Sequence, residues 1–219
     1  MKNFLIIAFT LLVTLFKSQI AQDTILKTQD IETVIISDKD YEKYEISYDL
    51  KQNTNTRYLS IVESEIGLKF KNSYKKKGIV SDVILFLHKT EKDRPMTNLE
   101  INFYTLDSLT GKPEKKINNR QILYSPKKRS RGKVKINVLN YNIPFSKEGI
   151  FASIKWLPTL NNDKNVGPAV RLTAYSEPLT YTRYMDGKWG KKGNIFSKDE
   201  KYANVMMGIN VYFKKKKNE

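Results

Sequence analysis

The chain has 219 residues, with 39 Lys and Arg against 23 Asp and Glu, one histidine and no cysteine. The lack of cysteine excludes disulfides, thiolate metal sites and a lipid on an N-terminal cysteine, and one imidazole is too few for a usual zinc site. The basic excess attracts phosphates and acidic glycans through long-range electrostatics. Because this excess is nearly all lysine, the compositional bias of a genome is an alternative explanation for it.

The first 21 residues have the three-part pattern of a secretory signal peptide. Lys2 supplies the positive charge, residues 4–16 are apolar apart from two threonines, and a polar region follows from Lys17. A helix of this apolar length reaches about 20 Å, short of the roughly 30 Å hydrocarbon core, so cleavage is favoured over a permanent anchor. We therefore expect export to the periplasm, the outer membrane or the extracellular space, and no membrane span in the mature chain.

The segment 22–57 is polar and charged, and its one apolar cluster, residues 34–36, predicts a short strand. The stretch 38–56 is predicted to be partly helical or loosely ordered. Beyond this segment, short runs alternate apolar with polar residues, which is typical of strands with one buried face. The sequence thus predicts one β-domain over 58–213, followed by a basic tail at 214–219.

Eight or more strands are predicted in this domain, separated by turn signals. Residues 83–87 are apolar on both faces, as expected for a central strand that is covered on both sides. The pair Asp186-Gly187 is typical of a type I′ hairpin turn. The segments expected to have one core face and one water face are 66–70, 99–103, 134–138, 150–156, 170–174 and 205–213. The predicted fold is therefore mostly β, an antiparallel β-sandwich like a jelly roll.

Five motifs of turns and alternating apolar residues occur in this domain: 64–67 (Ser-Glu-Ile-Gly), 107–113 (Asp-Ser-Leu-Thr-Gly-Lys-Pro), 139–143 (Leu-Asn-Tyr-Asn-Ile), 149–157 and 180–189. Together they resemble a family of uncharacterised secreted bacterial β-sandwich proteins. In some members the sandwich follows a carboxypeptidase-regulatory-like domain, and residues 31–36 resemble the linker after it. The resemblance implies a sandwich over roughly 64–213, but no activity and no functional residues.

The sequence contains no motif for nucleophilic or nucleotide chemistry. A hydrolytic triad would pair His88 with a serine such as Ser81 or Ser130, yet no Gly-x-Ser-x-Gly elbow occurs, which favours a structural or surface histidine. The glycines in 187–193 follow a hairpin rather than opening a helix, so they do not predict a phosphate-cradling loop. We predict no catalytic residue, no metal and no cofactor.

A pair of carboxylates is the one kind of catalytic site that the sequence leaves possible. Two acids held at the right separation across a cleft would suffice for a glycan hydrolase. The candidates on predicted strands and turns are Glu63, Glu65, Asp82, Glu100 and Asp107. Solvated or ion-paired roles are favoured for them, because surface acids are common. Calcium binding is also open, although no Asp-x-Asp-x-Asp-Gly loop occurs.

One candidate binding element is basic. Lys127, Lys128, Arg129 and Arg131 lie in a loop that enters the predicted strand near residue 134. Arginine binds phosphate and sulfate through two parallel hydrogen bonds, so this loop is suited to a polyanion. The alternative is that these side chains are merely solvated.

A second candidate is aromatic. Tyr181, Tyr184 and Trp189 flank the predicted hairpin and can offer a platform for stacking sugars, with packing over the end of the sandwich as the favoured alternative. We therefore predict an exported, non-catalytic binding module for an anionic glycan or lipopolysaccharide, and export makes nucleic acid a secondary candidate. The alternatives are a carboxylate-based glycan hydrolase and a purely structural partner of another envelope protein.

Overall fold

The structure is a computed structural model, and it describes residues 39–48, 57–58, 60–191, 195–196 and 201–215. The predicted signal peptide, the predicted strand at 34–36 and the last four residues of the basic tail lie outside the described residues. Within the described ranges, no helix is both long and apolar enough to cross a bilayer.

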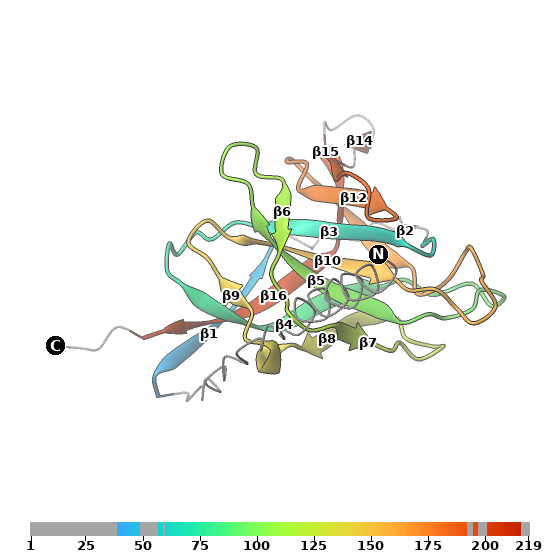
Figure 1. Cartoon of the computed structure of the whole chain (residues 1–219), viewed down its shortest axis with the longest axis horizontal. Helices are drawn as coiled ribbons and strands as arrows, with labels where there is room; N and C mark the ends of the chain where they lie inside the picture. Colours follow the sequence, from blue (N-terminus) through green and yellow to red (C-terminus); the bar gives the residue numbers. More distant parts are fainter. Residues whose placement is uncertain (1–38, 49–56, 59, 192–194, 197–200, 216–219) are drawn as a thin grey trace, which may run out of the picture. The chain divides into compact units, whose positions relative to one another are not determined.

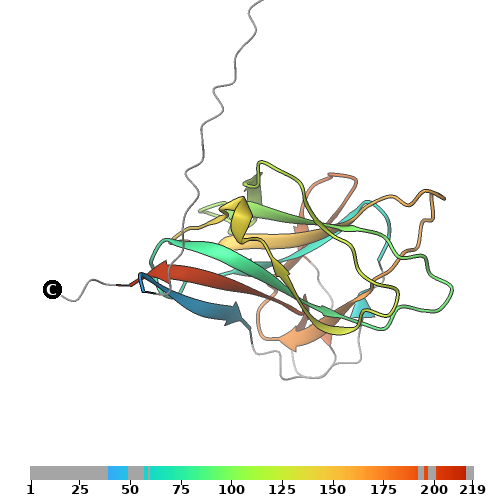
Figure 2. The ribbon, with the colours of Figure 1, turned by 90° about the horizontal axis from the view of Figure 1, so that it is seen from below.

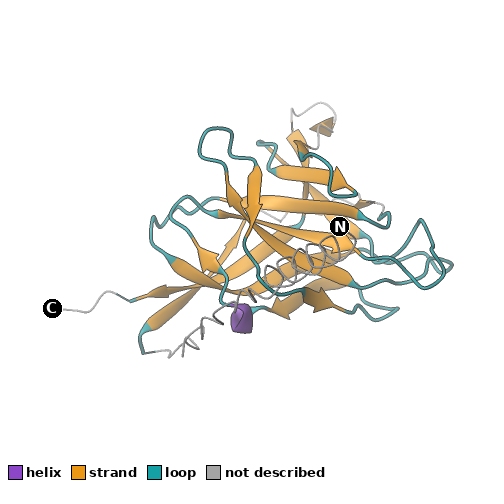
Figure 3. Cartoon of the chain, in the orientation of Figure 1, coloured by secondary structure: helices purple, strands orange, loops and turns teal. Residues whose placement is uncertain are grey.

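The described chain forms two antiparallel β-sheets (Figure 1, Figure 3). The first sheet has the order β1 (Tyr41–Ser47), β16 (Met207–Lys214), β4 (Gly78–Leu87), β11 (Val170–Tyr175), β15 (Lys201–Val205), β14 (Ile195–Phe196). Three further strands pair within it: β2 (Arg57–Tyr58), β8 (Gly132–Asn137) and β9 (Pro144–Phe145).

The second sheet has the order β13 (Gly190–Lys191), β12 (Thr180–Tyr184), β3 (Ser64–Phe70), β10 (Ile150–Trp156), β5 (Leu99–Leu106), β6 (Pro113–Lys116), and β7 (Ile122–Tyr124) pairs with β5. The one helix among the described residues is a 3-10 turn, η1 (Leu139–Tyr141). The predicted antiparallel β-sandwich is confirmed.

Alternating apolar side chains from the two sheets form one core. On β3 the core residues are Ile66, Leu68 and Phe70, each at most 1% exposed. Trp156 of β10 is fully buried, and its Nε1 donates a hydrogen bond to the Pro168 carbonyl at 2.9 Å. Each fully buried side chain of this kind contributes roughly 1.5–3 kcal/mol. A core of this extent stabilises the domain without a disulfide.

Strand β4 is the central strand of the first sheet, as its two apolar faces predict. It pairs with β16 and β11 along one edge and with β8 and β9 along the other. Val83, Ile84, Leu85 and Leu87 are at most 1% exposed. The position of β4 also decides where the loop that follows it leaves the sheet.

The first described strand, β1, differs from the expected helical or loose structure over 38–56. It pairs with β16 from Tyr41↔Lys214 to Ser47↔Gly208, and Figure 2 shows the two strands side by side. Its side chains are exposed or only half-buried, because it is an edge strand. The predicted start of the sandwich at residue 58 is therefore too late.

One predicted strand, 205–213, is two strands in the structure. The break falls at Met206, after which the chain changes its partner: β15 pairs with β11, whereas β16 pairs with β4. Alternation of apolar residues continues through the break, so the pattern by itself contains no sign of it.

Candidate anion-binding site

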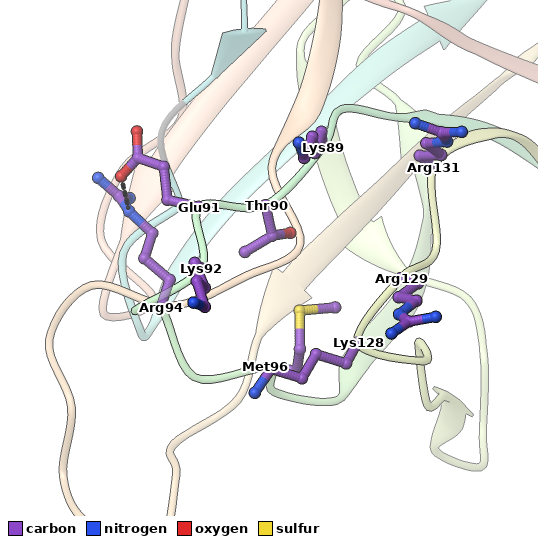
Figure 4. A pocket seen from close by; sticks show the side chains of 9 residues that line it. All are labelled: Lys89, Thr90, Glu91, Lys92, Arg94, Met96, Lys128, Arg129 and Arg131. Atoms are coloured by element: carbon purple, nitrogen blue, oxygen red, sulfur yellow. Dashed lines mark hydrogen bonds and ion pairs between the residues drawn. The ribbon is translucent and has the colours of Figure 1, made fainter.

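The predicted basic loop lines a cavity of about 740 Å³, which we call the basic pocket (Figure 4). Its walls are the β4–β5 loop, residues 88–98, and the β7–β8 loop, residues 125–131. The lining residues are Lys89, Thr90, Glu91, Lys92, Arg94 and Met96 from the first loop, and Lys128, Arg129 and Arg131 from the second. Its volume lies within the range of small-ligand sites, roughly 300–1,000 Å³.

Strand pairing explains why the two loops meet. Strands β4 and β8 are antiparallel neighbours, with Leu87 opposite Gly132 at the end of the ladder. The chain after Leu87 and the chain before Gly132 therefore leave the sheet at the same place. Gly132 has a φ of +81°, a left-handed conformation that glycine adopts without strain.

A turn presents the basic side chains of the β7–β8 loop. The Ser130 amide donates to the Lys127 carbonyl at 2.8 Å, and the Lys127 amide donates to the Ser130 Oγ at 3.0 Å. These two bonds close a four-residue turn that has Lys128 and Arg129 at its corner. Both side chains are exposed and line the pocket.

Positive charge dominates the pocket. Its one acid, Glu91, accepts a hydrogen bond from Arg94 Nε at 2.8 Å. The other cations that line it have no ion pair with an acid in the described part of the chain: Lys89, Lys92, Lys128, Arg129 and Arg131. Cations gathered in a concave site raise the local concentration of anions.

Two uncharged side chains lie between these cations. Thr90 and Met96 project from the β4–β5 loop toward the basic loop (Figure 4). The Thr90 Oγ1 is buried and has no hydrogen-bond partner among the described residues. Neighbouring protein atoms cover this hydroxyl, and a buried hydroxyl without a partner is costly.

The structure brings together part of the predicted basic set and adds to it. Lys128, Arg129 and Arg131 line the pocket, whereas Lys127 is exposed outside it. Sequence reasoning missed the cations of the β4–β5 loop, because they are scattered through 11 residues and form no run. Their one signal is that they follow a strand that is apolar on both faces.

The predicted aromatic platform is not formed as three exposed rings. Tyr181 is 3% exposed and packs with Tyr104 and Phe151 on the face of the second sheet that points away from the core. Trp189 is half-buried against them, with its ring centroid 5.0 Å from that of Phe151. Tyr184, by contrast, is 54% exposed. Tyr181 is thus a packing residue, because burying its ring against Phe151 removes apolar surface from water.

The hairpin turn lies one residue earlier than the sequence predicts. Met185 and Asp186 both have positive φ, 49° and 55°, and the Gly187 amide donates to the Tyr184 carbonyl at 3.0 Å. Positive φ at both central residues is what a type I′ turn requires.

A buried charged network lies beside these rings, and it contains Glu65, one of the acids for which a solvated or ion-paired role was favoured. Glu65 is 1% exposed, and its Oε1 accepts hydrogen bonds from Asn102 Nδ2, Tyr104 OH and Ser153 Oγ. Its Oε2 is bound by the Arg183 guanidinium. Burial lowers the pKa of Arg183, but the charge and hydrogen bond of Glu65 outweigh this and leave it raised. Arg183 therefore stays charged.

The remaining acids named as hydrolase candidates also have partners, or lie on the other sheet. Glu63 pairs with Lys155 at 2.7 Å and Glu100 with Lys116 at 2.9 Å. Asp82 lies on the other sheet, in β4.

Asp107 accepts hydrogen bonds from Thr110 in the β5–β6 turn. The His88 Nδ1 lies 3.0 Å from the Lys89 carbonyl, and its side chain is half-buried. Across the described ranges, no group of three or more His, Cys, Asp or Glu could hold a metal ion.

No protein-family model matches the chain, and no curated protein matches it. Among solved structures, a clostridial cysteine protease, Cwp84 after propeptide cleavage, is 13% identical with a TM-score of 0.49, over 81% of this chain and 41% of that one. The cysteine protease and lectin-like domains of Cwp84, a surface layer associated protein of Clostridium difficile, are 12% identical with a TM-score of 0.43, over 81% and 37%. The chain therefore spans less than half of either structure, and likeness at this level says nothing about function.

Proposed function

We propose that this protein is an exported, non-catalytic module that binds an anionic glycan in the basic pocket. The observation that carries the proposal is the gathering of six Lys and Arg side chains from two loops around one cavity that contains a single acid. That acid, Glu91, is already paired with Arg94.

The chemistry of the pocket favours phosphate, sulfate or carboxylate groups. Arg129 and Arg131 each carry a planar guanidinium, which forms two parallel hydrogen bonds with such groups. The lysines add charge without a fixed geometry, which accommodates more than one arrangement of the anion. Export, which the N-terminal sequence predicts, would bring the pocket into contact with the acidic glycans of cell envelopes.

The glycan-hydrolase alternative has weaker support. Glycoside hydrolysis needs two carboxyl groups that are free to exchange protons or attack the sugar. Glu65 is instead fixed by Arg183, Glu63 by Lys155 and Glu100 by Lys116. None of these acids lines the basic pocket.

The test is binding of the purified mature protein to lipopolysaccharide and to heparin, with neutral dextran as the reference glycan. Both anionic glycans should bind, and added salt should weaken the binding because the pocket is open to solvent. The double variant Arg129→Ala with Arg131→Ala should bind at least about tenfold more weakly, since a hydrogen bond to a charged group contributes roughly 1.5–3 kcal/mol.

The matched control is Lys76→Ala with Lys77→Ala. It removes the same charge from the exposed β3–β4 loop, outside the pocket. Equal loss in both double variants would mean that net charge alone is responsible, and no binding by the parent protein would overturn the proposal.

A further inference from the structure

A second cavity adjoins the basic pocket. It has a volume of about 400 Å³ and shares Lys92, Arg94, Met96 and Lys128 with the basic pocket. We call it the polar cavity. The four shared residues form the boundary between the two cavities, so a ligand longer than one sugar ring has room to contact both.

The polar cavity has a different chemistry. Beyond the shared residues, its lining consists of Asp93, Pro95, Asn161 and Asp163. Carboxylate and amide oxygens accept hydrogen bonds from sugar hydroxyls. The same two carboxylates offset much of the charge of the three shared cations, so a second anionic group is less favoured there than in the basic pocket.

Asp163 is held in place by its own turn. The Thr159 hydroxyl donates to Asp163 Oδ2 at 2.9 Å, and the Asp163 amide donates to the Thr159 Oγ1 at 3.0 Å. The chain between them passes through Asn162 in a left-handed conformation, with a φ of 55°. A carboxylate fixed in this way binds a ligand with less loss of side-chain entropy than a free one.

Within the basic pocket, the uncharged surface is suited to a sugar ring rather than to a bare anion. Met96 offers apolar contact in the lining. Inorganic phosphate would leave this surface unused. A sugar that carries an acidic group can contact both the cations and Met96.

From this arrangement we infer that the ligand is an acidic oligosaccharide in which a charged sugar occupies the basic pocket and an uncharged sugar occupies the polar cavity. The inference rests on the proposed function and narrows it to glycans of mixed charge. Uniformly charged chains, such as heparin fragments or single-stranded DNA, would place negative charge against Asp93 and Asp163.

The probe is a hyaluronan tetrasaccharide, in which charged and uncharged sugars alternate, compared with free glucuronic acid. Calorimetry should give a dissociation constant at least about tenfold lower for the tetrasaccharide, because it fills both cavities. Asp163→Asn and Asn161→Ala should each weaken tetrasaccharide binding about fivefold and leave glucuronic acid unchanged. Arg129→Ala should weaken both.

Two controls separate the possible outcomes. Glu114→Gln makes the same charge change as Asp163→Asn at an exposed position of β6 and should leave binding unaltered. A heparin fragment of equal length should bind more tightly to the Asp163→Asn variant than to the parent protein.

The inference is overturned if the tetrasaccharide binds no better than glucuronic acid. It is also overturned if the Asp163 and Asn161 variants leave tetrasaccharide binding unchanged while Arg129→Ala still weakens it. In both cases the proposed function still stands. The inference is overturned as well if single-stranded DNA or heparin binds the parent protein more tightly than the tetrasaccharide. Failure of every anionic glycan to bind would remove the proposed function itself.

Discussion

The Arg183 guanidinium binds one oxygen of the Glu65 carboxylate through both Nε and Nη2, each 2.7 Å away. The two residues are 118 positions apart and lie opposite each other on neighbouring strands β12 and β3. Arg183 is also 4.6 Å from the centre of the Trp189 ring. This ion pair is specific to one register, because a slip of β3 by one residue would turn Glu65 to the core face of the sheet, away from Arg183.

Replacing Glu65 with Gln should destabilise the protein by about 3 kcal/mol, since it leaves the charge of Arg183 without its partner. Urea unfolding followed by circular dichroism measures this free energy. The control is Glu100→Gln, whose partner Lys116 has a side chain that is 43% exposed. This second change should cost less than about 1 kcal/mol. Equal losses would mean that the Glu65–Arg183 pair is no more important than a surface pair.

Replacing Gly67 with Ala should also destabilise the sandwich. A Cβ at this position would lie 2.4 Å from the Ala152 carbonyl oxygen and 2.6 Å from the Phe151 ring, so β3 and β10 would have to separate. We expect a loss of about 1–3 kcal/mol, the usual effect of overpacking. Gly190→Ala is the control, because the nearest atom to its Cβ would be 3.9 Å away. In thermal unfolding, Gly67→Ala should have a clearly lower melting temperature than Gly190→Ala.

The stability of the protein should depend on Asp82 at acidic pH. Burial raises the pKa of this carboxyl, but hydrogen bonds from Lys43, Asn210 and Ser81 outweigh burial and leave it lowered. A lowered pKa in the folded state contributes stability above the unfolded value, roughly pH 4, which is lost as the pH falls through the folded pKa. Asp82→Asn removes this contribution.

The difference in melting temperature between the parent protein and Asp82→Asn should therefore be largest near neutral pH and shrink below about pH 4. Thermal unfolding monitored between about pH 2 and pH 7 measures it. Asp93→Asn, at an exposed position in the β4–β5 loop, should show no such convergence. A difference for Asp82→Asn that stays constant with pH would contradict the prediction.

The two tryptophans should report different environments. Trp156 is fully buried in the core, whereas Trp189 is half-buried on the outer face of the second sheet. Trp189→Phe should therefore leave a blue-shifted emission that acrylamide quenches poorly. Trp156→Phe should leave emission that acrylamide quenches readily. Similar quenching in the two variants would contradict the placement of one ring in the core.

Local alternation was enough to predict the longer strands that build the core, such as β3, β4, β5, β10 and β16. Side chains on a strand point to opposite faces in turn, so Ile66, Leu68 and Phe70 mark a core face without any knowledge of their partners. The doubly apolar run in β4 likewise indicated a central strand. The pattern did not predict β1, because that strand lies at an edge and buries little of either face.

For the candidate site, the order of residues was enough to place Arg129 and Arg131 close together in a basic loop, because neighbours in the chain are neighbours in space. That Lys89 and Lys92 line the same cavity follows from the fold alone, since the pairing of Leu87 with Gly132 joins segments more than 40 residues apart. The same holds for the burial of Glu65. Whether a charged side chain faces water or a partner depends on residues from distant strands, and the order of residues along one strand contains no information about them.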